Sequence, residues 1–311
     1  MSFRLFFFRS LIGSTVSIII LICINIWIDL YGLYWRREGI SIYSDERTSK
    51  YLLAHRYIPE NFDGYILGPS LSANLNPKEI RELKIYNLSM LGANITEQKT
   101  VVDKAISLKS PKFVIICLHP YLTVDHGMKT NMINQQQYYG ALGSVWLYKS
   151  YLLKIVRTHN LIPGKYPKNQ FNDYGYNDYD DLLTTMPVED KIREQMQRSD
   201  AINASIDSTA LLEFRSLIEE LVSKKVTIIA YFHPIPFPIH QKYLNPLGDY
   251  KSKMVNELNT KAIVLDFNSS KYGFFTKDFT NYIDHGHLSK KGQQFLLKEI
   301  IKESGLIKTV H

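Results

Sequence analysis

The chain has 311 residues, of which 45% are hydrophobic, including 21 Tyr and 15 Phe. This composition supplies a sizeable core and excludes an intrinsically disordered chain, and the length predicts one large domain or two small ones. The net charge of +7 comes from scattered basic residues, which argues against nucleic-acid binding. The charge suits a protein near an anionic membrane or surface polymer, and Lys-rich solvated faces explain it equally well. Only two cysteines occur, Cys23 in an apolar segment and Cys117 in a predicted strand, so no disulfide framework is expected.

The amino-terminal segment predicts a membrane anchor. Residues 11–28, "LIGSTVSIIILICINIWI", carry no charge and are long enough to cross the hydrocarbon layer of a bilayer. A cleaved signal peptide is the alternative, but its apolar region is normally shorter and ends at a small-residue cleavage site, whereas the aromatic "DLYGLYWRR" follows here. We therefore predict an uncleaved signal anchor within residues 1–37. Arg4, Arg9 and the terminal amine precede the span, and Arg36 and Arg37 follow it. The nearer charges and the amine favour a cytoplasmic amino terminus, which places a single-pass protein in the cell membrane with its domain outside the cytoplasm.

The rest of the chain predicts an α/β domain. A connector at residues 38–61, with a short amphipathic helix around residues 45–55, leads into a domain at residues 62–311. Short apolar runs bounded by polar or glycine residues predict buried strands, and runs with helical spacing lie between them. The predicted strands are 62–68, 83–89, 112–119, 226–232 and 261–267, and the predicted helices are 96–109, 208–225, 247–258 and 289–304. This alternation predicts a parallel sheet covered by helices on both faces.

One long segment breaks the alternation. Residues from about 120 to 205 contain some helix and a stretch rich in Asn, Asp and Tyr, and they are too long for a simple connection. We predict a lid or cap inserted into the sheet domain, because ligand sites recruit such loops. A disordered insert is the alternative, against which the many tyrosines argue.

Polar residues follow the predicted strands where a ligand would bind. Open parallel sheets bind ligands beyond the carboxyl ends of their strands. Ser70 follows a Gly-Pro pair at the end of the first strand, and His119 ends the third. The loop "NYIDHGHLSKKG" before the last helix supplies Asp284 and His287. Ser, His and Asp from separate segments can form a nucleophile, a base and the carboxylate that orients the base.

The same residues admit other roles. Ser70 could be an ordinary turn serine, and Ser72 is a rival nucleophile. A metal site using Asp284, His285 and His287 is disfavoured, because no other dense cluster of His, Cys or Asp supplies the remaining ligands. Ser289 has the position of an N-cap of the last helix, and His233, in "YFHPIPFPIH", lies at the rim of the cleft with no assigned chemistry.

Three stretches resemble a known family. "ILGPSLS", "YNLSMLGAN" and "DHGHLSKKG" resemble the first, second and last blocks of the SGNH (GDSL-like) hydrolase superfamily, over roughly residues 62–120 and 226–304. They most resemble its membrane-anchored branch, which includes the D-alanine transfer protein of teichoic acid synthesis and alginate O-acetyltransferase-like proteins. The resemblance implies a three-layer αβα fold with a flavodoxin-like sheet. It also implies Ser70 as nucleophile, His287 as base and Asp284 as its partner, with no metal and no cofactor.

The sequence also departs from the family pattern. The usual Gly-Asp-Ser is Gly-Pro-Ser here, and the second-block Gly aligns most simply with Ser89, whose backbone N–H could still serve an oxyanion. The Gly-x-Asn-Asp of the third block is missing, and "LHPY" with His119 stands in its place. Loss of one oxyanion donor costs about 10²–10³ in rate. The candidates for oxyanion or substrate binding are therefore Asn87, Ser89, Gly92 and His119.

Two functions follow from this resemblance. The leading prediction is an extracytoplasmic serine O-acyltransferase or esterase of the cell envelope that acts on a surface polysaccharide or polymer, with a membrane-bound acyltransferase as a candidate partner. The alternative is a non-catalytic SGNH-like binding or assembly subunit of a surface-polymer acylation or export system. The missing third block favours the alternative, and the retention of Ser70, Asp284 and His287 together disfavours it.

Overall fold

Five short apolar strands pair in parallel to form one sheet. The structure is a computed structural model, and it describes residues 3–124, 133–162, 171–177, 184, 186–198 and 202–307. The strands are β1 (Gly64–Leu67), β2 (Ile85–Asn87), β3 (Phe113–Leu118), β4 (Thr227–Phe232) and β5 (Ile263–Asp266). Their order in the sheet is β2-β1-β3-β4-β5, and every neighbouring pair is parallel. This is the flavodoxin-like order, so the predicted fold class is confirmed.

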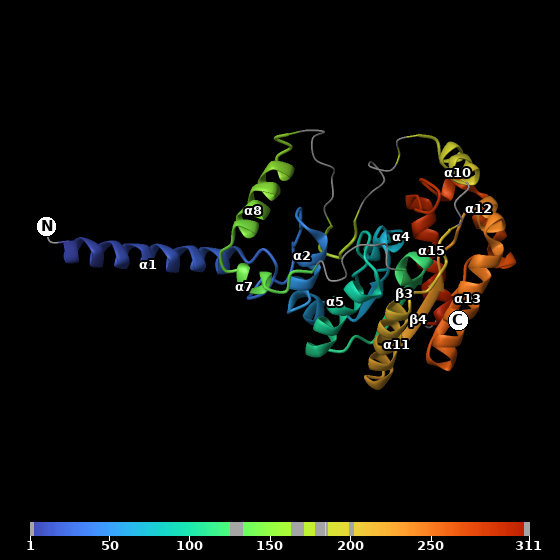
Figure 1. The fold of residues 1–311 in the computed structure, drawn as a ribbon, viewed down its shortest axis with the longest axis horizontal. Helices are drawn as coiled ribbons and strands as arrows, with labels where there is room; N and C mark the ends of the chain where they lie inside the picture. Colours follow the sequence, from blue (N-terminus) through green and yellow to red (C-terminus); the bar gives the residue numbers. More distant parts are fainter. Residues whose placement is uncertain are drawn as a thin grey trace.

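Helices cover both faces of the sheet because successive residues of each strand point to opposite sides. In β3, Val114 and Ile116 belong to one core, whereas Ile115 and Cys117 belong to the other. The helices of the first core include α5 (Ile95–Leu108), α11 (Ser208–Ser223) and α13 (Leu244–Leu258), and those of the second core are α14 (Gly273–Lys277) and α15 (Lys290–Ser304) (Figure 1). Short 3₁₀ helices complete the domain at η1 (Pro77–Glu79), η2 (Asn259–Lys261), η3 (Ser270–Tyr272) and η4 (Phe279–Asn281).

The helices begin and end close to the predicted positions. Asn94 and Glu97 form a reciprocal capping box at the start of α5, which satisfies two backbone N–H groups. Ser289 is the N-cap of α15, as predicted, and accepts the Gly292 N–H at 3.3 Å. The helix ends at Gly305, which has a positive φ of 67°.

The connector belongs to the core rather than forming a simple tether. Its helices are α2 (Glu46–Leu53) and α3 (Tyr57–Asn61), and Leu52, Leu53 and Ile58 are fully buried in the first core. The buried Lys50 ammonium pairs with Glu46 and donates to the Ser89 carbonyl. The connector therefore packs against the loop that follows β2.

The first helix stands apart from the domain. α1 (Phe3–Ile28) projects from one side of the molecule with its apolar side chains exposed (Figure 1). Its mean hydropathy is 2.4 over an 18-residue window, so by length and composition it is a candidate membrane span or signal anchor.

The described parts of the insertion lie in several separate places. α7 (Gln137–Gly140) and α8 (Val145–Thr158) lie near the end of α1, and α6 (Pro120–Thr123) directly follows β3 (Figure 1). α10 (Val188–Gln197) packs instead on α12 (Phe237–Lys242), through Ile192 and Ile239. Much of the Asn-, Asp- and Tyr-rich stretch lies outside the described residues, so the lid stays a prediction.

Gly68 shapes the turn that leads from β1 to Ser70 and to the short helix α4 (Ser70–Ala73). Its φ is +153°, a conformation that side chains of L-residues rarely adopt. A β-carbon at this position would lie 2.4 Å from Ser72 Oγ and 2.6 Å from Cys117 Cβ. Only glycine fits between α4 and β3 at this point.

We predict that Gly68→Ala destabilises the protein by about 1–3 kcal/mol more than Gly39→Ala, because the added methyl group overpacks the turn. Gly39 is a matched control, since it also has a positive φ, of 67°, but a β-carbon there meets nothing within 4 Å. Thermal unfolding of the full chain in detergent measures the difference. Equal losses of stability in the two variants would contradict the packing account.

Candidate active site

Ser70, His287 and Asp284 form a continuous chain of hydrogen bonds. Ser70 Oγ lies 3.0 Å from His287 Nε2, although the two residues are 217 positions apart in the sequence. On the other side of the ring, His287 Nδ1 lies 2.8 Å from Asp284 Oδ2. Both distances fall within the range of about 2.6–3.2 Å that proton transfer requires.

The loop before α15 fixes the carboxylate of Asp284. Its Oδ1 accepts the backbone N–H groups of Gly286 at 2.8 Å and of His287 at 2.7 Å. Burial alone would raise the pKa of Asp284, but these hydrogen bonds and the neighbouring imidazole lower that pKa well below its ordinary value. Asp284 is therefore ionised at neutral pH and accepts a hydrogen from Nδ1. His287 Nε2, which lies 3.0 Å from Ser70 Oγ, is then the ring nitrogen without a hydrogen and can accept the Ser70 hydroxyl proton.

The buried His233 contacts the loop that carries Asp284 and His287. It follows β4, is 1% exposed, and its Nε2 lies 2.8 Å from the Gly286 carbonyl oxygen. Asn268 holds its backbone by donating to the His233 carbonyl at 2.8 Å. Burial lowers the pKa of His233 to about 4, so the ring is neutral and donates from Nε2. The sequence placed His233 at the rim of the cleft, and the structure shows that it also contacts the loop that carries Asp284 and His287.

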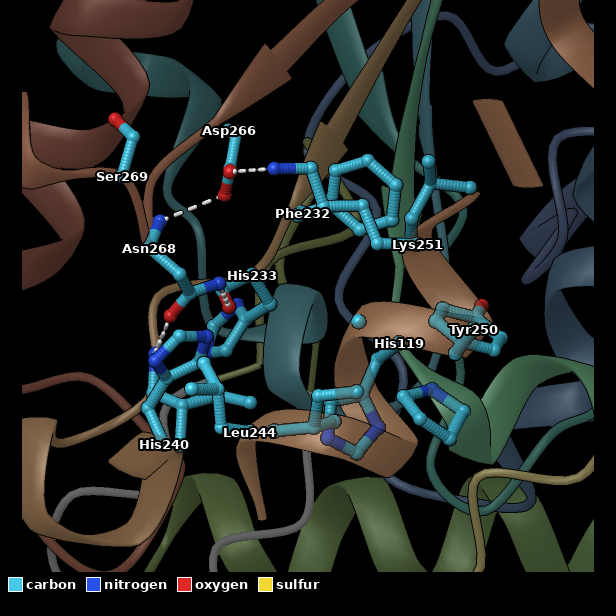
Figure 2. Close-up of a pocket in the computed structure, with 15 residues that line it drawn as sticks. His119, Phe232, His233, His240, Leu244, Tyr250, Lys251, Asp266, Asn268 and Ser269 are labelled. Atoms are coloured by element: carbon cyan, nitrogen blue, oxygen red, sulfur yellow. Dashed lines mark hydrogen bonds and ion pairs between the residues drawn. The ribbon is translucent and has the colours of Figure 1, made fainter. Parts of the chain in front are cut away.

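The side chains of Ser70 and His287 lie in the wall of a cavity of about 240 Å³. The cavity is lined by Ser70, Leu71, His119, Tyr121, Gln195, Ile202, His233, Ile235, Ile239, His285, Gly286 and His287. A neighbouring cavity of about 250 Å³ shares His119, His233 and Ile235 and extends toward α13 and the Lys251–Asp266 ion pair (Figure 2). The apolar walls and few polar groups of the first cavity suit a small acyl group next to the Ser70 hydroxyl.

Asn87, at the end of β2, and Ser89 contact the segment after Ser70 and do not line this cavity. Asn87 Nδ2 donates to the carbonyl oxygens of Ser72 and Leu75 at 2.7 and 2.9 Å. The Ser89 N–H donates to Asn87 Oδ1 at 2.9 Å, and Ser89 is completely buried. This differs from the prediction that the Ser89 N–H faces an oxyanion, because the neighbouring amide already accepts it. Asn87 and Ser89 therefore position the loop that carries Ser70.

The other sequence candidates divide into structural and cavity positions. Ser72 is fully buried and donates to Ser89 Oγ at 2.8 Å, which leaves it no access to a substrate. His119 lines the cavity and accepts the Tyr121 N–H through Nδ1 at 3.2 Å. Gly92 is not among the residues that line the cavity, and a β-carbon there would be 3.3 Å from Arg47 Nη2 and 3.6 Å from the Tyr121 hydroxyl oxygen.

A metal is not suggested by the described part of the chain. No group of three or more His, Cys, Asp or Glu side chains within it is arranged to hold an ion. Asp284 instead directs both carboxylate oxygens to the His287 ring and the backbone of its own loop.

Among known proteins, the chain matches several solved structures. No family model matches the chain, and no curated protein matches it. A protein described as a platelet activating factor from Streptococcus pneumonia is similar with a TM-score of 0.45 at 9% identity, over 83% of this chain and 90% of that one. A GDSL-like lipase from Bacteroides thetaiotaomicron has a TM-score of 0.37 at 9% identity, over 79% and 90% of the two chains. TesA has a TM-score of 0.35 at 10% identity, over 78% and 97%.

These neighbours include GDSL-like lipases and acylhydrolases, the class that the sequence blocks resemble. At such identities and TM-scores the likeness carries no argument about chemistry. The chemistry proposed for this chain therefore rests on the geometry of its own site, and the membrane-anchored branch stays a prediction.

The buried imidazole of His233 predicts a pH-dependent stability. Its folded pKa of about 4 lies below the ordinary value of about 6.5, so between these values the unfolded chain binds the extra proton. We expect native stability to fall, relative to His233→Gln, by up to about 3 kcal/mol as the pH drops from 6.5 to 4. Unfolding curves at several pH values between 7.5 and 4.5 measure this difference. Parallel pH profiles for the two proteins would contradict it.

Proposed function

We propose that this protein is a membrane-anchored serine esterase or O-acyltransferase that acts on a surface polysaccharide or polymer outside the cytoplasm. The observation that carries the proposal is the unbroken chain from Asp284 through His287 to the Ser70 hydroxyl, at 2.8 and 3.0 Å. Such an arrangement activates a serine, because the imidazole can accept the hydroxyl proton as the oxygen attacks.

In the first half-reaction, Ser70 Oγ attacks the carbonyl carbon of an acyl ester and passes its proton to His287 Nε2. The carboxylate of Asp284 stabilises the imidazolium that forms. When the tetrahedral intermediate collapses, the bond to the leaving alcohol breaks and His287 returns the proton to that oxygen. The product is an acyl group on Ser70 and a free alcohol.

In the second half-reaction, an acceptor hydroxyl gives its proton to His287 Nε2 and attacks the acyl carbon. The Ser70–acyl bond breaks, and Ser70 Oγ regains the proton from His287. Water as acceptor gives hydrolysis, whereas a sugar hydroxyl gives O-acylation. No cofactor takes part, because the acyl ester itself supplies the driving force.

The negative oxygen of the intermediate needs hydrogen-bond donors. We assign the Ser70 backbone N–H to this role and the Gly92 N–H as its partner. The position of Gly92 beside Tyr121, which lines the Ser70 cavity, supports the second assignment. His119, on the same cavity wall, is placed to contact the acyl donor or acceptor.

The apolar helix α1 supports a location at the membrane. An anchored domain works beside polymer that is linked to the membrane, or beside a membrane-bound acyl donor. The positive net charge of +7 favours an anionic polymer of the cell envelope as the acceptor.

We predict that Ser70→Ala and His287→Ala each lower turnover of a small activated ester by about 10³-fold or more. The double variant should be little worse than either single variant, because residues that act as one unit lose their effect together. Ester hydrolysis by the purified full chain in detergent measures this. Losses that multiply in the double variant would indicate two independent binding residues.

Ser289→Ala is a matched control from the loop that carries His287. Ser289 caps α15 and donates to the Thr280 carbonyl at 2.7 Å, so its loss should cost about 1 kcal/mol of stability. Turnover at a temperature well below unfolding should stay close to the native value.

The acyl content of the surface polymer in a Ser70→Ala strain decides between the enzyme and the non-catalytic assembly subunit. Normal acylation there, with a folded variant, would favour a non-catalytic assembly subunit.

The proposed topology has its own test. Protease added to intact cells from which any wall or outer membrane has been removed should degrade the domain, because residues after α1 lie outside the cytoplasm. Immunoblotting against an epitope on α11 follows the fragment. Protection until the cells are lysed would reverse the orientation.

A further inference from the structure

Helix α8 presents an apolar face to solvent. The exposed side chains recur at spacings of three and four residues, so they lie on one side of the helix. They are Val145 (87% exposed), Tyr148 (41%), Leu152 (60%) and Ile155 (53%). Leu147 and Ser150, on the opposite side, are buried against the domain. A contiguous apolar stripe of this kind marks an interaction surface rather than a solvated one.

Two further apolar side chains are exposed in the chain after α8. Leu161 and Ile162 follow the helix and are 61% and 41% exposed. Lys149 is exposed beside the stripe, where its long side chain can place a charge at the edge of an apolar phase. The surface therefore combines an apolar centre with a basic margin.

Specific contacts fix α8 to the end of α1. Asn25 Nδ2 donates to the Leu142 carbonyl oxygen at 2.8 Å and contacts the Tyr148 hydroxyl at 3.1 Å. The Tyr151 hydroxyl donates to Asn25 Oδ1 at 3.2 Å. Because Tyr148 belongs to the exposed stripe and also touches α1, the stripe adjoins the side of the domain from which α1 emerges.

The direction of α8 differs from that of α1. Figure 1 shows α1 projecting away from the domain, while α8 runs across that direction on the same side of the molecule. The rings of Tyr31 and Trp146 stack with centroids 5.3 Å apart and tie the start of α8 to the residues after α1. If α1 crosses a bilayer, α8 therefore lies along its surface.

Aromatic and basic residues gather at the end of α1, next to α8. Trp27 and Trp35 are 73% and 53% exposed at the end of α1, as expected of side chains in a headgroup region. Arg36 lies over the Trp35 ring, 5.9 Å from its centroid. Arg36 also lies near Lys154 of α8, and burial together with this positive neighbour lowers the pKa of Lys154. Neither side chain has a carboxylate partner within the described ranges, so anionic headgroups would complement this pair.

We propose that α8 is a second membrane contact, an interfacial helix whose apolar face lies in the lipid surface next to α1. The inference rests on the membrane anchoring in the proposed function and is independent of the catalytic chemistry. A span and a surface helix together fix the orientation of the domain, whereas a span alone leaves it free to tilt. The Ser70 cavity would then stand at a set height and angle above the bilayer.

The test uses the full chain in liposomes that contain phosphatidylglycerol. An environment-sensitive fluorophore is attached at position 152 or 155 through Leu152→Cys or Ile155→Cys in a Cys23→Ser background, with Cys117 buried and unlabelled. Leu212→Cys is the matched control, because Leu212 is 63% exposed on α11, away from the proposed surface. Labelled Cys23 in the native sequence reports on α1 itself.

We expect nitroxide-bearing lipids to quench the labels at positions 152, 155 and 23 but not at position 212, and iodide in the water to quench only position 212. Iodide quenching of positions 152 and 155 as strong as that of position 212 would overturn the proposal while leaving the span intact. Labels shielded from both quenchers would also overturn it and would indicate a protein, such as a second copy, on this face. Absence of lipid quenching at position 23 would overturn the span and the inference together. A failed ester assay with normal lipid quenching would contradict only the catalytic proposal.

Discussion

The hydrogen bond between Ser70 Oγ and His287 Nε2 joins the first turn of the sheet domain to its last loop. Its two partners come from opposite ends of the domain sequence: Ser70 follows β1, and His287 lies between β5 and α15. They meet because all neighbouring strands are parallel, so the carboxyl ends of the five strands lie on the same side of the sheet. The tight turn at Gly68 then directs the Ser70 side chain toward His287 at the carboxyl ends of the strands.

A set of buried polar contacts holds the two partners in place. Asn87 ties the end of β2 to the segment after Ser70, and Asn74 Nδ2 donates to the Leu288 carbonyl at 3.0 Å. His233 reaches the same loop from β4 through the Gly286 carbonyl. Buried polar groups are costly unless they are paired, so these contacts favour one arrangement of the site over looser ones. The serine and histidine are thus preorganised before a substrate arrives.

The sequence predicted most of the fold because its signals are local. The run "KFVIICLH" reads as a buried strand on its own, and β3 occupies Phe113–Leu118 within it. The position of Ser70 after a Gly-Pro pair and of Asp284 and His287 before α15 also follows from local patterns, combined with the rule that strand ends share an edge. What these residues do is still a proposal, but their proximity could be anticipated.

Other features depend on contacts between distant side chains and had no local signal. Ser89 was expected to offer its N–H to an oxyanion, and only the structure shows Asn87 Oδ1 accepting it. His233 directly follows β4 just as His119 directly follows β3, and only the contact of His233 with the Gly286 carbonyl oxygen shows that it supports the loop before α15. The apolar face of α8 is equally hidden in the sequence, because a run such as "VWLYKSYLLKIV" reads as an ordinary amphipathic helix until its inner side is known.

Mapping of a covalent adduct tests the nucleophile most directly. The purified full chain is treated with a fluorophosphonate, digested and analysed by mass spectrometry, with His287→Ala treated in parallel. The account predicts one modified site, Ser70, in the native protein and a severe loss of modification in the His287→Ala variant. A folded native protein that stays unmodified, or an adduct on another residue, would contradict the proposed role of Ser70.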